Sequence, residues 1–218
     1  ISMMIFFSFL IGCIFGSFLG VVSDRWGSTA AIIWGRSHCN SCKRQLSWRH
    51  LIPLVSQIFY KSRCAYCQEA FSYSYFFLEF LTGLLFVAAL DLSLVRFFTL
   101  LFSLLLSKFD IDSFSYPLSL GLFFSILFFL CFPAHLLSYF CLALAILAHF
   151  FDINIGAGDF LWLFLASFSL SLNQMLYLLQ IASFCGLFFL LIKKERKLPF
   201  IPFLSLAYLI VILLPQIL

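Results

Sequence analysis

The sequence predicts an all-α polytopic membrane protein with about eight transmembrane helices. Of its 218 residues, 64% are hydrophobic, whereas soluble domains contain about 45–50% apolar residues. Only 10% are charged, too few to cover a water-exposed surface of this size. The apolar residues fall in unbroken runs of helical length, unlike the alternating strands of about 10 residues in an outer-membrane barrel. This composition excludes a soluble domain, a barrel and a nucleic-acid-binding domain.

The predicted spans divide the chain into a first helix over 1–23, a polar loop over 24–72 and a seven-helix domain over 73–218. The spans cover residues 3–22, 73–90, 92–107, 114–132, 135–151, 160–172, 174–192 and 200–218. Two of them, 92–107 and 160–172, reach only about 24 Å and 20 Å at 1.5 Å per residue, against a hydrocarbon core of about 30 Å. Either their flanking loops line a polar cavity below the membrane surface, or the boundaries are displaced by a few residues.

The basic residues indicate the orientation. If the polar loop is cytoplasmic, alternation of the spans places every one of the 13 lysines and arginines except Arg96 on the cytoplasmic side. We therefore expect external N- and C-termini and a multi-pass membrane protein in contact with lipid.

The cytoplasmic loop carries two C-x-x-C knuckles, Cys39–Cys42 and Cys64–Cys67, separated by 21 residues. Two intervening residues let both thiolates of a knuckle face one ion, and four thiolates complete the closed tetrahedral shell of structural zinc. A pair of disulfides is the alternative, but a reducing compartment disfavours it. The remaining cysteines, in apolar spans, are expected only to pack; they are Cys13, Cys131, Cys141 and Cys185.

Four aspartates lie near the predicted cytoplasmic edge: Asp110 and Asp112 after one span, Asp152 after another, and Asp159 before the next. Asp159 suits the N-cap of an apolar helix. The preceding glycines instead suggest a close approach of another backbone, which a cap does not require. Two carboxyls that share a site, one ionised and one protonated, are the catalytic groups of an aspartic protease.

These motifs together resemble the type IV prepilin peptidases over nearly the whole chain. They are Gly16-Ser17-Phe18-Leu19 with Arg25, the two knuckles, Asp110-Ile111-Asp112 with Pro117, Gly156-Ala157-Gly158-Asp159, and Pro199-Phe200-Ile201-Pro202-Phe203. The resemblance implies a catalytic dyad of Asp110 and Asp159, with Asp112 as the rival first member. Compact loops make the chain most similar to the competence-type members of Gram-positive bacteria.

The resemblance also implies what the chain acts on. The leader of a type IV prepilin or pseudopilin would be removed at the cytoplasmic face, and many members then methylate the new N-terminus with S-adenosylmethionine. Glu79, Gly156 and Gly158 are the residues implied for binding substrate or methyl donor. The alternative for Glu79 is a buried ion pair with Arg25 or Lys108.

Two other functions remain open from the sequence. One is a presenilin-like general intramembrane protease, which shares the G-x-G-D motif but not the cysteine knuckles. The other is a proton-coupled transporter with a zinc-stapled loop, although transporters usually place their acidic residues near the membrane midplane.

Overall fold

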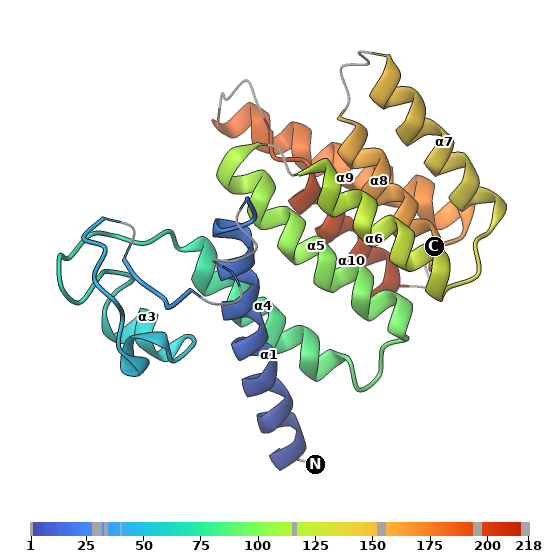
Figure 1. The fold of residues 1–218 in the computed structure, drawn as a ribbon. Helices are drawn as coiled ribbons and strands as arrows, with labels where there is room; N and C mark the ends of the chain where they lie inside the picture. The colour runs from blue at the N-terminus through green and yellow to red at the C-terminus, as the bar shows by residue number, and fades with distance from the viewer. Residues whose placement is uncertain are drawn as a thin grey trace. The chain divides into compact units, whose positions relative to one another are not determined.

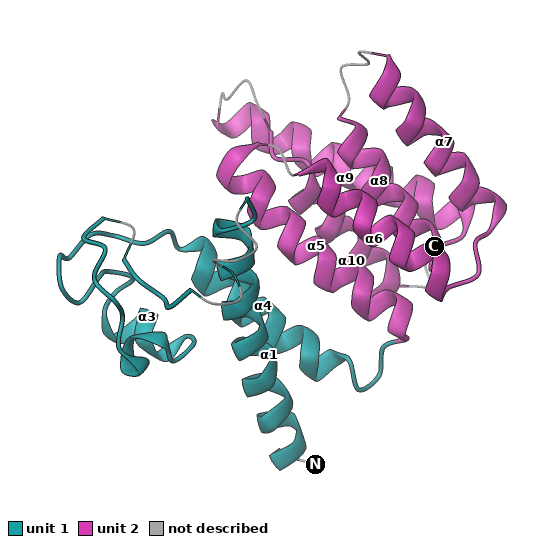
Figure 2. Cartoon of the chain, viewed as in Figure 1, with its two compact units in different colours: residues 1–92 teal, residues 93–218 magenta. Residues whose placement is uncertain are grey.

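The computed structural model describes residues 2–27, 32, 35–39, 41–114, 117–151, 156–193 and 198–214. The chain folds as two compact units, Ile1–Leu92 and Ser93–Leu218 (Figure 2). Within the described ranges the regular structure is helical, and β-pairing is limited to isolated bridges in the polar loop. The all-α prediction is therefore confirmed for the described chain.

Each of the eight predicted spans corresponds to an apolar helix in the described part of the chain (Figure 1). These helices are α1 (Ser2–Asp24), α4 (Ser74–Ala88), α5 (Leu94–Ser113), α6 (Leu118–Cys131), α7 (Leu136–Phe150), α8 (Ala157–Ser167), α9 (Leu172–Lys193) and α10 (Ile201–Leu213). The polar loop adds the 3-10 helix η1 (Trp48–Leu51) and the short helix α3 (Val55–Phe59).

Several predicted boundaries were wrong. The span 114–132 corresponds to a helix that begins at Leu118, and the span 160–172 corresponds to the helix Ala157–Ser167. Helix α5 does not end at residue 107 but continues to Ser113, because its last turns are held by a Lys108–Asp112 ion pair of 2.6 Å one helical turn apart. Helix α10 ends at Leu213 and not at 218, since Pro215 disfavours the helical conformation for the residue before it. Hydropathy shows how far an apolar run extends, but a helix can continue into polar residues or end before the apolar run does.

Two helices, α1 and α9, are long and apolar enough to cross a membrane by length and composition, with mean hydropathies of 2.4 and 2.2. Five further apolar helices have 10–17 residues, and α5 carries four charged side chains. The count of eight crossings thus remains a prediction.

In the first unit, α1 and α4 pack through glycines (Figure 1). A Cβ atom at Gly12 would lie 2.5 Å from the Thr82 carbonyl oxygen, and one at Gly83 would lie 2.7 Å from the Cys13 sulfur. A Cβ at Gly16 would collide with the Thr82 hydroxyl. Small residues at four-residue spacing allow this close backbone approach, as in membrane helix pairs. The predicted packing role of Cys13 is consistent with its burial here.

In the second unit, the short helix α8 packs against α5, α6, α7 and α10. Residues 161–167 are all buried, and the indole N–H of Trp162 donates a 2.8 Å hydrogen bond to the Ser103 hydroxyl. The Trp162 ring also meets Tyr208 of α10 edge-on, with centroids 6.0 Å apart. Because protein surrounds α8 on several sides, its 11 residues position Asp159 without having to face lipid along their length.

Candidate active site and metal centre

Asp110 lies near the end of α5 with only 8% of its surface exposed. Its Oδ2 accepts a 3.0 Å hydrogen bond from the backbone N–H of Ile201, the first residue of α10, and the Phe200 N–H also reaches the carboxylate. The first N–H groups of a helix have no partner within that helix and carry partial positive charge. The Asp110 side chain of α5 thus caps the N-terminus of α10, and the hydrogen bonds from α10 hold its carboxylate in a fixed position.

Asp159 lies in the first turn of α8, three residues after the N-cap, which is Gly156. Its own N–H donates to the Gly156 carbonyl at 3.0 Å. The alternative of Asp159 as an N-cap was therefore wrong: the helix starts earlier than hydropathy indicates, because Ala157 and Gly158 already adopt helical conformation. The side chain is left to interact elsewhere, and its carboxylate has an electrostatic interaction with that of Asp110.

Asp112 has a different environment from Asp110. Its side chain is 38% exposed and pairs with Lys108, whose own side chain is only 2% exposed. Residues two apart on a helix do not share a face. Of the two aspartates on α5, buried Asp110 accepts a hydrogen bond from the start of α10, whereas Asp112 pairs with a buried lysine. Asp152 lies outside the described residues.

The space beside Asp159 is open at Gly156. A Cβ atom on Gly156 would be 3.6 Å from the Asp159 Oδ2 and would otherwise approach only the Gly158 nitrogen, at 4.0 Å, within the described structure. The Gly156 dihedrals, φ −63° and ψ 132°, suit any residue. The backbone conformation at position 156 therefore does not require glycine. The lack of a side chain there leaves room next to the Asp159 carboxylate. Gly158 lies within α8 on the same first turn.

The four cysteines of the loop converge on one point. Their sulfur atoms all lie within 4.8 Å of one another, and those of Cys39 and Cys67 are 3.7 Å apart. A tetrahedral zinc with Zn–S bonds of about 2.3 Å requires sulfur separations of about 3.8 Å. The cluster therefore fits a structural zinc ion, with Cys39, Cys42, Cys64 and Cys67 as its ligands.

The two knuckles repeat one backbone geometry, which the sequence analysis did not anticipate. In the first, the Lys43 N–H donates to the Cys39 carbonyl at 2.9 Å; in the second, the Gln68 N–H donates to the Cys64 carbonyl at 3.0 Å. Lys43 and Gln68 both follow the second cysteine and both have positive φ, 58° and 60°. Each turn aims backbone N–H groups at a sulfur, and those of Cys42 and then Ser41 lower the pKa of the Cys39 thiol to about 6. A thiol of this kind readily supplies the thiolate that a metal binds.

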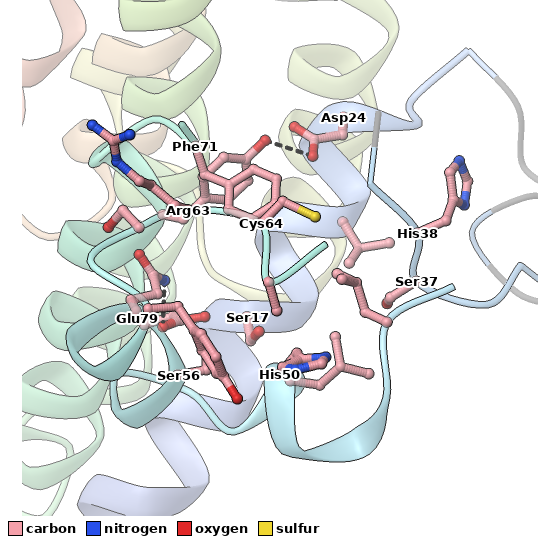
Figure 3. A pocket seen from close by; sticks show the side chains of 18 of the residues that line it. Ser17, Asp24, Ser37, His38, His50, Ser56, Arg63, Cys64, Phe71 and Glu79 are labelled. Atoms are coloured by element: carbon pink, nitrogen blue, oxygen red, sulfur yellow. Dashed lines mark hydrogen bonds between the residues drawn. The ribbon is translucent and has the colours of Figure 1, made fainter. Parts of the chain in front are cut away.

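Glu79 lies beside a cavity of about 350 Å³ in the first unit (Figure 3). It is 5% exposed, and its Oε2 accepts two 2.8 Å hydrogen bonds, from the Leu54 backbone N–H and from the Gln57 side-chain amide. The Ser17 hydroxyl of α1 also hydrogen-bonds to it. Of the two predicted ion-pair partners, Lys108 pairs with Asp112 instead.

The loop contributes most of the cavity wall, a role that hydropathy could not predict. Charged residues of both signs line it, together with aromatic rings and Cys64 of the second knuckle. Among the buried side-chain polar atoms of the described residues, Gln57 Oε1 is the one without a hydrogen-bond partner. The charged lining residues are Asp24, Arg25, Arg63 and Glu79.

Comparisons with known proteins agree with these features. Residues 10–92 match the family described as Bacterial Peptidase A24 N-terminal domain. The chain is 42% identical over 84 residues to the prepilin leader peptidase/N-methyltransferase of Myxococcus xanthus (strain DK1622) and 38% identical over 81 residues to that of Bacillus subtilis (strain 168). It is 36% identical over 89 residues to the protein of the same name from Klebsiella pneumoniae.

These alignments involve only part of each protein. They cover 37–38% of this chain and 25%, 33% and 39% of the three relatives. No solved structure matches the chain. The matched region, residues 10–92, contains the glycine-packed helices, the four-cysteine cluster and Glu79. Over this region the chain is similar to the prepilin leader peptidases, whose own length it spans by less than half.

Proposed function

We propose that the chain is an intramembrane aspartic endopeptidase that removes the leader of type IV prepilins or pseudopilins. The observation that carries the proposal is the placement of two aspartates on packed helices: the Ile201 N–H of α10 fixes buried Asp110 of α5, and Asp159 lies in the first turn of α8, within electrostatic range of Asp110. Two carboxyls in one site share a proton, because like charges at short range cannot both ionise. The names of the relatives supply the substrate class.

In this mechanism Asp110 is the ionised member, because the Ile201 and Phe200 N–H groups donate to its carboxylate. Asp110 takes a proton from water as the water oxygen adds to the scissile carbonyl carbon, and protonated Asp159 gives its proton to the carbonyl oxygen. As the tetrahedral intermediate collapses, Asp110 gives its proton to the amide nitrogen, the C–N bond breaks, and a hydroxyl of the intermediate returns a proton to Asp159 as the new carboxyl group forms. The space beside Gly156 would admit the extended substrate backbone.

We further propose that the new N-terminus is methylated with S-adenosylmethionine bound in the Glu79 cavity. The relatives are named N-methyltransferases as well as peptidases. The cavity offers carboxylates for the donor's ammonium group, guanidinium groups for its carboxylate, and the unpartnered Gln57 Oε1 as an acceptor for an N–H. Zinc in the four-cysteine site would be structural and take no part in either reaction.

The proposed location is the bacterial inner membrane, with several crossings and the active site at the cytoplasmic face. A prepilin presents an apolar helix behind a polar, basic leader, so its scissile bond would lie at this face while the helix stays in lipid.

The experiment is to incubate the purified, detergent-solubilised protein with a prepilin, with and without S-adenosylmethionine, and to measure intact masses. Leader loss in both samples and an added methyl group only with the donor would support both activities. Cleavage of unrelated transmembrane substrates at similar rates would favour a presenilin-like protease. Proton flux in liposomes without any cleavage would favour a transporter.

A further inference from the structure

The segment between the two knuckles reaches from the loop to Glu79 on α4. Leu54 and Gln57 belong to the 21 residues that separate Cys42 from Cys64, and both donate to the Glu79 Oε2 at 2.8 Å. The Glu79 carboxylate is thus hydrogen-bonded both to the loop and to Ser17 of α1, the helix that packs against α4. The position of this carboxylate depends on how the loop is folded.

Leu54 makes its hydrogen bond from a strained turn. Its φ is 58° and its ψ is −50°, and the Val55 N–H donates to the Pro53 carbonyl at 2.6 Å, which closes a three-residue γ-turn of the rare positive-φ kind. A branched residue in such a conformation persists only where the surrounding structure over-determines it. The turn therefore requires a rigid support on its C-terminal side.

Backbone hydrogen bonds connect the segment after this turn to the second knuckle. The Ser62 N–H donates to the Gln57 carbonyl at 2.8 Å, and the Phe71 N–H donates to the Ser62 carbonyl at 2.7 Å. Ser62 is 5% exposed and lies two residues before Cys64, which is 1% exposed. A short series of hydrogen bonds thus connects the cysteine cluster, through Gln57, to Glu79.

The loop has few buried residues. Between residues 41 and 72, Ser62 and Cys64 are the residues buried in the structure, so the loop has no apolar core of its own. Metal bound by four cysteines would supply the folding free energy that such a core supplies elsewhere.

We propose that the four-cysteine metal centre positions Glu79, and that Gln57 is the positioning residue that links the two. When the ion is bound, the loop is rigid, the Leu54 turn is maintained and the Glu79 carboxylate is held at the cavity wall. When the ion is lost, the two loop donors withdraw and the carboxylate becomes accessible to water. Metal occupancy thereby controls whether the cavity exists as a binding site.

The test measures the chemical accessibility of Glu79 rather than enzyme activity. Zinc-loaded and chelator-treated protein in detergent are treated with a water-soluble carbodiimide and an amine, and adduct formation at Glu79 is followed by peptide mass spectrometry. Exposed Asp91, outside the loop, is the internal reference. We expect chelation to raise Glu79 labelling about tenfold or more, the factor that loss of hydrogen bonds to a charged group provides. Added zinc should reverse the increase.

Gln57→Met isolates the link, because methionine has a similar length but no amide. With zinc bound, this variant should label at Glu79 more than the zinc-loaded wild type, because one of the two loop donors is lost, whereas Gln45→Met, at an exposed glutamine of the same loop, should label like the zinc-loaded wild type. If Gln57→Met does not retain zinc, Gln57→Asn serves instead, since its amide falls one methylene short of Glu79.

Equal Glu79 labelling with and without zinc, or equal labelling of the Gln57 and Gln45 variants with zinc bound, would overturn the proposal. The result does not depend on the proposed function, because no prepilin and no methyl donor is present. A chain that fails to cleave prepilins can still show the zinc-dependent change at Glu79, and the reverse can also occur.

Discussion

The backbone N–H of Ile201 donates a 3.0 Å hydrogen bond to the Oδ2 of Asp110, joining residues 91 positions apart in the sequence. Ile201 is the first residue of α10 and is 1% exposed. The bond is therefore shielded from water and directs the carboxylate to one side of α5. It distinguishes Asp110 from Asp112, two residues later, which is half exposed and paired with Lys108.

The first prediction concerns the carboxyl groups of Asp110 and Asp159. Asp110→Asn and Asp159→Asn should each reduce leader cleavage by several orders of magnitude, because either change removes the shared proton while conserving side-chain volume. Cleavage rates on a purified prepilin are the measurement. Asp112→Asn is the matched control and should keep most activity, since its carboxylate pairs with Lys108.

Full activity of Asp159→Asn would contradict the aspartic mechanism. Loss of activity in Asp112→Asn but not in Asp110→Asn would make Asp112 the first member of the dyad.

The second prediction concerns the metal. Purified protein should contain about one zinc per chain, because four thiolates close one tetrahedral shell. Cys39→Ser should lower the zinc content and the thermal stability, since the ion supplies most of the loop's folding free energy. Elemental analysis and thermal unfolding check both. Cys185→Ser, at a half-buried cysteine of α9 outside the cluster, should keep its zinc; disulfides in reduced, metal-free protein would disprove the site.

The third prediction concerns the glycine contact of α1 with α4. Gly16→Ala should destabilise the protein by about 1–3 kcal/mol, the usual cost of overpacking a close contact. The added methyl group would collide with the Thr82 hydroxyl and lie 2.8 Å from the Glu79 Cα. Gly27→Ala is the control, because no atom of the described residues lies within 4 Å of its added Cβ. Thermal unfolding in detergent distinguishes them, and equal melting temperatures would show that α1 and α4 do not pack this closely.

The fourth prediction concerns the space beside Asp159. Gly156→Val and Gly158→Val should each reduce cleavage at least about tenfold, because a branched side chain would occupy the path of the substrate backbone. Folding at position 156 should be little affected, since the nearest atom to an added Cβ is 3.6 Å away. Cleavage kinetics and melting temperature are measured together. Normal cleavage by both variants would mean that these glycines do not form a substrate path.

Much of the fold follows from local chemistry. The lengths of the apolar runs place the eight helices to within a few residues, and the C-x-x-C spacing identifies all four cysteines of the cluster that could hold a metal. Both features depend on residues close together in the chain. The match of each helix to a predicted span is the direct result, although the number of membrane crossings is not established by helix lengths alone.

The tertiary structure decided which side chains meet. The family resemblance favours Asp110 over Asp112, two residues later, but only the packing of α10 against α5 gives Asp110 its backbone donor. Likewise, nothing near Gln57 in the sequence indicates that its amide would hold Glu79, 22 residues away. Periodicity and motif spacing report on the local chain, whereas hydrogen bonds between distant residues depend on how the helices and the loop pack, and a single sequence carries no local signal of that packing.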